Sequence, residues 1–208
     1  MPTSAKFTFD INIERASYFL EIHAGTQPGV GAPDLARREL PRGAVVFAVG
    51  AIDAYISQVS AEVLVAQLQQ PASGADQRET LKRVQAEVPT LALEIALLPS
   101  ESQRLERIES AILDYFQNST SSLGSKAVNA AVLRMGRKPS EVWTPLSEQF
   151  TNPADELDRW TEVRHQIVHR GMKPRVWRPH AEKFIDLAIA LVTLVDSIAS
   201  DVIAHPAA

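Results

Sequence analysis

The sequence predicts an all-α fold, a single-domain helical bundle, and three observations lead to this prediction. Proline and glycine divide the chain into segments whose apolar residues recur at helical spacing. No segment shows the alternation of apolar and polar residues that is typical of a strand. The chain has 208 residues, which fits one domain, and its 45% of apolar residues can build a substantial core.

The N-terminal part predicts two helices joined by a loop. The first is expected over residues 12–24, where apolar side chains recur every three or four residues. A loop rich in proline and glycine follows, and we expect it to end at Pro41. The second helix is expected from Ala44 to about Gln69, because this stretch has an apolar stripe and few helix breakers. The expected organisation is an N-terminal helix and loop at 1–41, a helical domain at 42–203 that forms one compact unit with it, and a tail at 204–208.

The middle of the chain predicts shorter helices. A polar linker at 70–76 precedes a segment that Pro89 is expected to kink or split. An amphipathic helix is expected over 102–118, where charged residues alternate with apolar ones. Two short helices should follow, one over 126–135 and one that Ser140 caps.

The last part of the chain predicts two longer helices. One should begin at Pro153, since proline is well tolerated in a first turn, and end at Gly171. The other is expected over 180–203 and is apolar on nearly every side between residues 187 and 195. We therefore expect this final helix at the centre of the bundle or in a subunit interface.

Composition excludes several classes of protein. The chain has no cysteine, so it has no disulfide framework and no thiolate nucleophile or metal ligand. Its net charge of -4 argues against coating nucleic acid over the whole surface, although a local basic site remains open. Residues 1–9 lack the order of a signal peptide, and the apolar run at 187–195 is shorter than a membrane span of about 20 residues. We therefore expect a soluble cytoplasmic protein without a membrane partner.

A short motif in the penultimate helix carries the candidate chemistry. The sequence from Glu162 to Gly171 reads EVRHQIVHRG and places Arg164 and His169 five residues apart. Metal-free cleavage of RNA requires a base, an acid and positive charge at the transition state. Arginine offers a planar fork that suits two phosphate oxygens, and imidazole can give or take a proton near neutral pH. The pair therefore suggests chemistry on a phosphodiester.

The spacing of this pair sets a geometric condition. Positions five apart on an ideal helix differ by about 140°. Arg164 and His169 therefore converge only if the helix ends near His169 or if a second copy of the chain contributes. Gly171 makes the first arrangement possible. One histidine cannot easily serve as base and acid at once.

The same residues carry a resemblance to a known family. Arg164, four residues and then His169, with polar His165 after the arginine, look like the R-x(4–6)-H motif of HEPN domains. These are all-helical proteins that include many metal-independent ribonucleases. The stretch at 42–57, with its acidic residue Asp53, resembles the early helix of the RiboL-PSP-HEPN group. Together the resemblance extends over most of the chain.

The resemblance implies a metal-independent endoribonuclease that cleaves single-stranded RNA through its 2′-hydroxyl and needs no cofactor. Because HEPN protomers typically join their motifs, it also implies a homodimer whose composite cleft is lined by Arg164 and His169 of both chains. His165 would support orientation, and Asp53 would reach in from the second helix. The RiboL-PSP-HEPN type is associated with stress response and phage defence, where a regulatory or antitoxin protein is a further partner. HEPN toxins often carry a modifiable tyrosine where this chain has Gly171, which puts that form of regulation in doubt.

The residues after the motif are basic. Between Glu162 and Glu182 the chain has no acidic residue, although the whole protein is acidic. Cations suit the phosphates of a single strand, and an indole suits stacking with its bases. The expected RNA-binding residues are Arg170, Lys173, Arg175, Trp177 and Arg178. The alternative is that these cations only complement the negative end of the motif helix and keep a loop solvated.

The candidate catalytic residues also have structural explanations. Arginine and histidine near a helix C-terminus are common caps and contribute roughly 0.3–1 kcal/mol through the helix dipole. Asp53 can be a buried partner of Arg164 or can face solvent. On this interpretation the protein is a catalytically inactive HEPN module that binds RNA, a nucleotide or a protein partner through the same groove.

A metal site is a third interpretation. Asp158, Glu162, His165 and His169 fall on one helical face, and Glu162-x-x-His165 has the spacing used in di-iron bundles. Such a bundle requires a second Glu-x-x-His, which the chain lacks, and the His-Glu-x-x-His zinc motif is also absent. We therefore expect no metal ligands.

Overall fold

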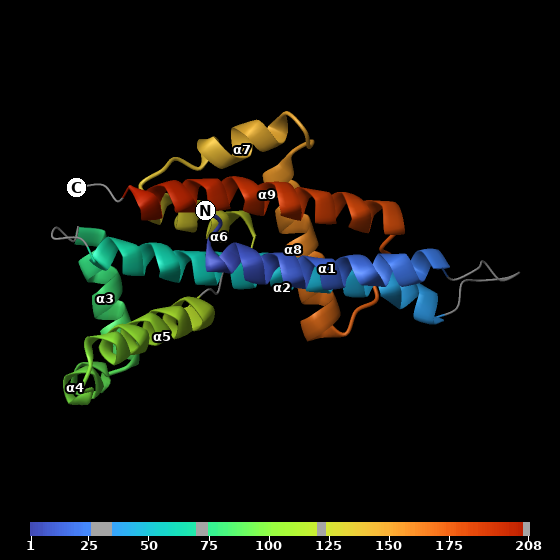
Figure 1. Cartoon of the computed structure of the whole chain (residues 1–208). Coiled ribbons are helices and arrows are strands. Elements are labelled where there is room, and N and C mark those ends of the chain that lie inside the picture. Colours follow the sequence, from blue (N-terminus) through green and yellow to red (C-terminus); the bar gives the residue numbers. More distant parts are fainter. Residues whose placement is uncertain (26–34, 70–74, 120–123, 206–208) are drawn as a thin grey trace, which may run out of the picture.

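The computed structural model describes residues 1–25, 35–69, 75–119 and 124–205, and within these ranges the regular structure is entirely helical (Figure 1). The all-α prediction is confirmed. The helices are α1 (Ser4–Gly25), α2 (Leu35–Leu68), α3 (Ala75–Glu87), α4 (Leu91–Leu97), α5 (Glu101–Ser119), α6 (Ser125–Arg134), α7 (Ser140–Ser147), α8 (Pro153–Arg170) and α9 (Arg178–Ala204).

The main hydrophobic core lies among α1, α2 and α9, which run side by side, and α6, α7 and α8 complete it (Figure 1). Each long helix contributes fully buried side chains, such as Phe9, Val45 and Leu191. The final helix is central to the bundle, as its apolar sequence predicts. Because α1 shares this core, the N-terminal helix and the rest of the chain form one packed unit.

A second, smaller core joins α3, α4 and α5 to the last turns of α2. Its buried residues include Leu64 from α2, Leu91 from α4 and Phe116 from α5. Figure 1 shows these helices projecting from one end of α2, away from α8. Pro89 lies between α3 and α4, so its predicted interruption of this segment is confirmed.

Three predicted helix starts are wrong. Helix α1 begins at Ser4 rather than at residue 12, because the hydroxyl of Thr3 accepts the N–H of Lys6 at 3.1 Å and so caps the first turn. Helix α2 begins at Leu35 and contains Pro41, which was expected to end a loop. A proline removes one helical hydrogen bond without forbidding the helix. Ser140 is the first residue of α7 and does not cap it. The other glycines and prolines of the expected loop lie outside the described residues.

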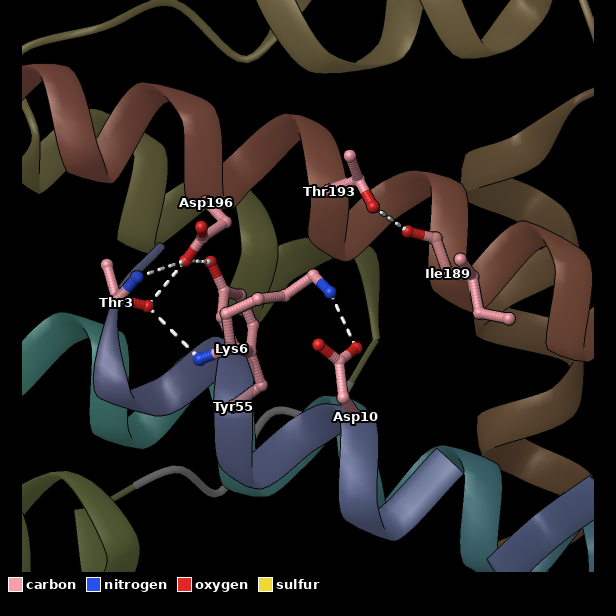
Figure 2. Close-up of polar contacts among 7 residues, drawn as sticks. All are labelled: Thr3, Lys6, Asp10, Tyr55, Ile189, Thr193 and Asp196. Atoms are coloured by element: carbon pink, nitrogen blue, oxygen red, sulfur yellow. Dashed lines mark hydrogen bonds and ion pairs between the residues drawn. The ribbon is translucent and has the colours of Figure 1, made fainter. Parts of the chain in front are cut away.

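A buried polar network ties the N-terminus to α9 and α2 (Figure 2). The carboxylate of Asp196, 7% exposed, accepts hydrogen bonds from the backbone N–H and hydroxyl of Thr3 and from the Tyr55 hydroxyl at 3.4 Å. Burial, followed by the charge of Asp196, raises the pKa of Tyr55 well above its usual value, so this phenol stays a donor. The network holds the start of α1 against the other two long helices.

Helices α2 and α9 are each long and apolar enough to cross a membrane by length and composition alone. The short run at 187–195 falls below a span, but the whole of α9 passes this test. In the bundle the two helices pack against each other and share the main core. A cytoplasmic location stays a prediction.

Candidate catalytic and RNA-binding site

The site is built on the last turns of α8. The helix begins at Pro153 and ends at Arg170, as predicted, and Gly171 follows with φ 61° in the left-handed region. Glycine adopts this conformation without steric cost, and it lets the N–H of Met172 reach back to the carbonyl of Gln166 at 3.0 Å. This ending leaves the last turn of α8 open to solvent.

Arg164 and His169 converge within one protomer. Nη1 of Arg164 lies 3.1 Å from Nε2 of His169. A guanidinium can only donate, so Nε2 accepts this hydrogen bond and the ring proton is on Nδ1. Arg164 is half-buried and His169 is exposed. Both residues lie in the last turns of α8, and the long arginine side chain spans the angle between the two positions.

His165 and Asp53 lie near this pair in different ways. The rings of His165 and His169 have centroids 5.0 Å apart and are tilted by 42°. Asp53 comes from α2 and is half-buried. Burial raises the pKa of Asp53, and the charge of Arg164 acts in the opposite direction. Within the described structure Asp53 and Arg164 form no ion pair, so Asp53 is a neighbour of the arginine rather than its bonded partner.

The segment between α8 and α9 is fixed to α2 through its backbone. Arg42, 8% exposed, donates from Nε to the carbonyl of Pro174 at 2.7 Å and from Nη2 to the carbonyl of Lys173 at 2.9 Å. The guanidinium of Arg175 lies over the indole of Trp177, 3.8 Å from the ring centroid. The basic segment therefore has a defined path along the start of α2.

This path makes one wall of a cleft with a volume of about 630 Å³. Four of the five residues predicted to bind RNA line it: Lys173, Arg175, Trp177 and Arg178. Arg170 does not line the cleft and lies beside the motif, 3.8 Å from Glu162.

The facing wall comes from elements that the sequence did not connect with the motif. His23 lies near the end of α1, and Arg37 and Arg38 lie in the first turn of α2. The adjacent arginines were a visible signal, but the expected loop up to Pro41 placed them outside any helix. No local pattern links them to residues far along the chain.

The described residues that line the cleft include several cations and no carboxylate. Among the described residues, Arg37, Arg38, Lys173 and Arg175 have no carboxylate at ion-pair distance, whereas Arg178 donates to Glu182 at 2.7 Å. The pKa of His23 is lowered by burial and then by the charges of Arg37 and Arg178, against a smaller opposing effect of Glu182. Such a surface suits an anion.

The acidic residues of the helical face that was considered as a metal site, and for which no metal ligands were expected, have other partners. Asp158 accepts hydrogen bonds from the N–H and the hydroxyl of Ser125, both at 2.7 Å, and so holds the start of α6. Glu162 accepts from Gln166 at 3.1 Å. In the part of the chain that the structure describes, no three potential metal-binding side chains gather in one place.

No family model, no curated protein and no solved structure matches this chain. The HEPN resemblance therefore depends on the two sequence stretches that carry it.

Proposed function

We propose that this protein is a metal-independent endoribonuclease that cleaves single-stranded RNA by attack of the 2′-hydroxyl, with Arg164 and His169 at its catalytic centre. The main support is the 3.1 Å contact between Arg164 Nη1 and His169 Nε2 on an exposed helix end. It joins a phosphate-binding group to a proton-transfer group without a second chain. The basic cleft formed by the segment after α8 supplies cations for another part of the same strand.

The chemistry follows from what each group can do. His169 removes the proton of the 2′-hydroxyl, whose oxygen attacks the adjacent phosphorus and displaces the 5′-oxygen of the next nucleotide. The products carry a 2′,3′-cyclic phosphate and a 5′-hydroxyl. Arg164 neutralises the charge that grows on the phosphoryl oxygens. His165, whose ring is the neighbour of His169, can protonate the leaving oxygen, as could a second His169 in a composite homodimer.

The contact between Arg164 and His169 must open before the reaction. Nε2 of His169 accepts the arginine in this structure, so it cannot take a proton from substrate at the same time. A phosphate would attract the guanidinium and form a bidentate pair with it. Substrate binding would therefore release the base that the reaction needs.

A catalytically inactive module is the second candidate. Arg164 and His169 lie towards the C-terminal end of α8, where cations and a bonded imidazole stabilise the helix without catalysis. The cleft would then be the functional surface and would bind RNA, a nucleotide or a protein partner.

The deciding experiment compares wild type, His169→Ala and a control, His205→Ala, which removes an exposed histidine at the end of α9. Each is incubated with mixed cellular RNA in EDTA, and the fragment ends are identified. The proposal expects cyclic-phosphate ends from wild type and the control but not from His169→Ala. Intact RNA with all three proteins would support the inactive module, and equal cleavage by all three would place the activity elsewhere.

The composite homodimer belongs to the same proposal and has its own test. Arg164→Ala and His169→Ala are mixed after each has been purified. If the cleft is composite, the mixture should cleave RNA faster than either variant alone, because a mixed dimer contains one Arg164 and one His169 in the shared cleft. No recovery, with dimers present, would assign the reaction to a single protomer. Action in stress response or phage defence, and an antitoxin partner, remain further parts of the proposal.

A further inference from the structure

The basic cleft is a different place from the catalytic pair. Its walls come from the end of α1, the start of α2 and the segment that leads into α9. Neither Arg164 nor His169 lines it. What the cleft binds is therefore a separate question from what the pair cleaves.

The cations of this cleft are concentrated rather than spread along a track. Arg37 and Arg38 on one wall and Lys173 and Arg175 on the other face a single concave volume, and none of the four has an ion-pair partner in the described ranges. A nucleic-acid strand carries one charge per nucleotide, spaced by about 3.4 Å along the helix axis in B-DNA. A group with several adjacent phosphates presents more charge within one compact site.

The start of α9 adds to the same field. Trp177 is the N-cap of this long helix, Arg178 and Pro179 follow it, and all three line the cleft. The first turn of α9 contains no acidic residue. The positive end of the helix dipole therefore adds to the positive potential of the surrounding cations, and both favour a bound anion.

Size and aromatic surface indicate what accompanies the phosphates. The volume of about 630 Å³ lies within the range of roughly 300–1,000 Å³ that is usual for small-molecule sites. The indole of Trp177 is 51% exposed, and Arg175 covers part of it. An exposed indole with a stacked guanidinium is a surface on which a nucleobase can stack.

We propose that this cleft binds a cluster of adjacent phosphates carried on a nucleoside, with the phosphates on Arg37, Arg38 and Lys173 and the base against Trp177. The phosphate cluster can come from a free nucleoside triphosphate or from the 5′-triphosphate end of an RNA strand. The proposal concerns the cleft that the proposed function uses for the RNA strand, but it does not rest on the catalytic pair, because neither Arg164 nor His169 lines the cleft.

The test measures binding by titration calorimetry in EDTA with four probes. These are ATP, inorganic triphosphate, and one RNA oligonucleotide carrying either a 5′-triphosphate or a 5′-hydroxyl. The double variant Arg37→Ala/Arg38→Ala should lower the affinity for the triphosphate-bearing probes about tenfold or more, since hydrogen bonds between charged groups are among the stronger ones. The matched control is Arg83→Ala, which removes an exposed cation on α3.

Trp177→Ala tests the contribution of the base to binding separately from that of the phosphates. Loss of stacking should lower the affinity for ATP roughly fivefold or more and leave the affinity for inorganic triphosphate nearly unchanged. Tight binding of ATP identifies the free nucleotide as the source, whereas preference for the triphosphorylated over the hydroxyl RNA, without ATP binding, identifies an RNA end.

Two results would overturn the proposal. One is no binding of any triphosphate-bearing probe at millimolar concentration. The other is equal binding of the two RNA ends without competition from inorganic triphosphate, which would make the cleft a track for the RNA backbone. His169→Ala should keep full ATP binding, so failure of the nuclease proposal and failure of this one give different results.

Discussion

The same three long helices form a cavity at each end of the bundle, and the two cavities have opposite charge. At one end, the last turn of α1 and the first turns of α2 and α9 form the basic cleft of about 630 Å³. At the other end, the start of α1, the later part of α2, α5 and the end of α9 enclose a groove of about 510 Å³. The groove carries Glu62, Glu106 and Glu109.

The charged residues at the two ends differ in whether they have bonding partners within the protein. Glu62 accepts hydrogen bonds from the hydroxyl of Ser4 and, at 2.8 Å, from the N–H of Ala5, so it holds the first turn of α1. Glu106 accepts from the hydroxyl of Ser102 at 3.1 Å. In contrast, Arg37 and Lys173 have no carboxylate partner among the described residues. The comparison indicates that charge in the groove supports the fold, whereas charge in the cleft remains available for a ligand.

The largest expected effect is on catalysis next to the basic end. Arg164→Lys keeps the charge but removes the planar fork, so we expect RNA cleavage to fall by about 10²–10³-fold. The control is Arg159→Lys, an exposed arginine of the same helix that pairs with Glu156. Single-turnover rates measure both. An unchanged rate in Arg164→Lys would show that the guanidinium does not contact the reacting phosphate.

The next effect concerns the two cavities directly. Arg37→Glu/Arg38→Glu should weaken binding of RNA with a 5′-triphosphate at low salt by about 10–100-fold and flatten its salt dependence. Glu106→Lys/Glu109→Lys makes the opposite reversal in the groove and should leave affinity unchanged or slightly higher. Fluorescence anisotropy at two salt concentrations measures both. Similar losses in the two variants would contradict a division of roles between the ends.

A smaller effect is expected on stability. Asp196→Ala would leave the hydroxyls of Thr3 and Tyr55 buried without their shared acceptor, which should cost about 1–3 kcal/mol of unfolding free energy. The control, Asp186→Ala, changes an exposed carboxylate of the same helix and should stay within about 0.5 kcal/mol of wild type. Denaturant unfolding provides the comparison. Equal stability of the two variants would show that the network does not stabilise the fold.

The smallest effect is a pH-dependent change at Asp53. Its folded-state pKa is raised, chiefly by burial, so ionisation of this carboxyl opposes folding. Well below the unfolded-state pKa of about 3.9, the carboxyl is protonated in both the folded and the unfolded protein and does not affect stability. As the pH rises from there through the folded-state pKa, ionisation of the buried carboxyl lowers the free energy of unfolding. Asp53→Asn should therefore raise Tm by about one or two degrees at neutral pH and less in acid. A larger increase in Tm in acid than at neutral pH would show that the folded-state pKa of Asp53 is not raised.

Local sequence patterns predicted most of the helices because apolar spacing, proline and glycine act within one or two turns. Gly171 marked the end of α8, and Pro89 marked the break between α3 and α4. The starts of α1 and α2 were missed for a physical reason. The first turn of α1 depends on Glu62, far along the chain, as well as on the nearby hydroxyl of Thr3, and the tolerance of Pro41 inside α2 is not visible in a local pattern.

The sequence by itself determined the helical class, the helix that carries Arg164 and His169, and the basic segment after it, since all three depend on neighbouring residues. Only the tertiary structure decided that His23, Arg37 and Arg38 face that segment across one cleft. This arrangement requires the end of α1, the start of α2 and the start of α9 to meet. Packing of the long helices in the core and the contacts of Arg42 with the carbonyls of Lys173 and Pro174 bring them together.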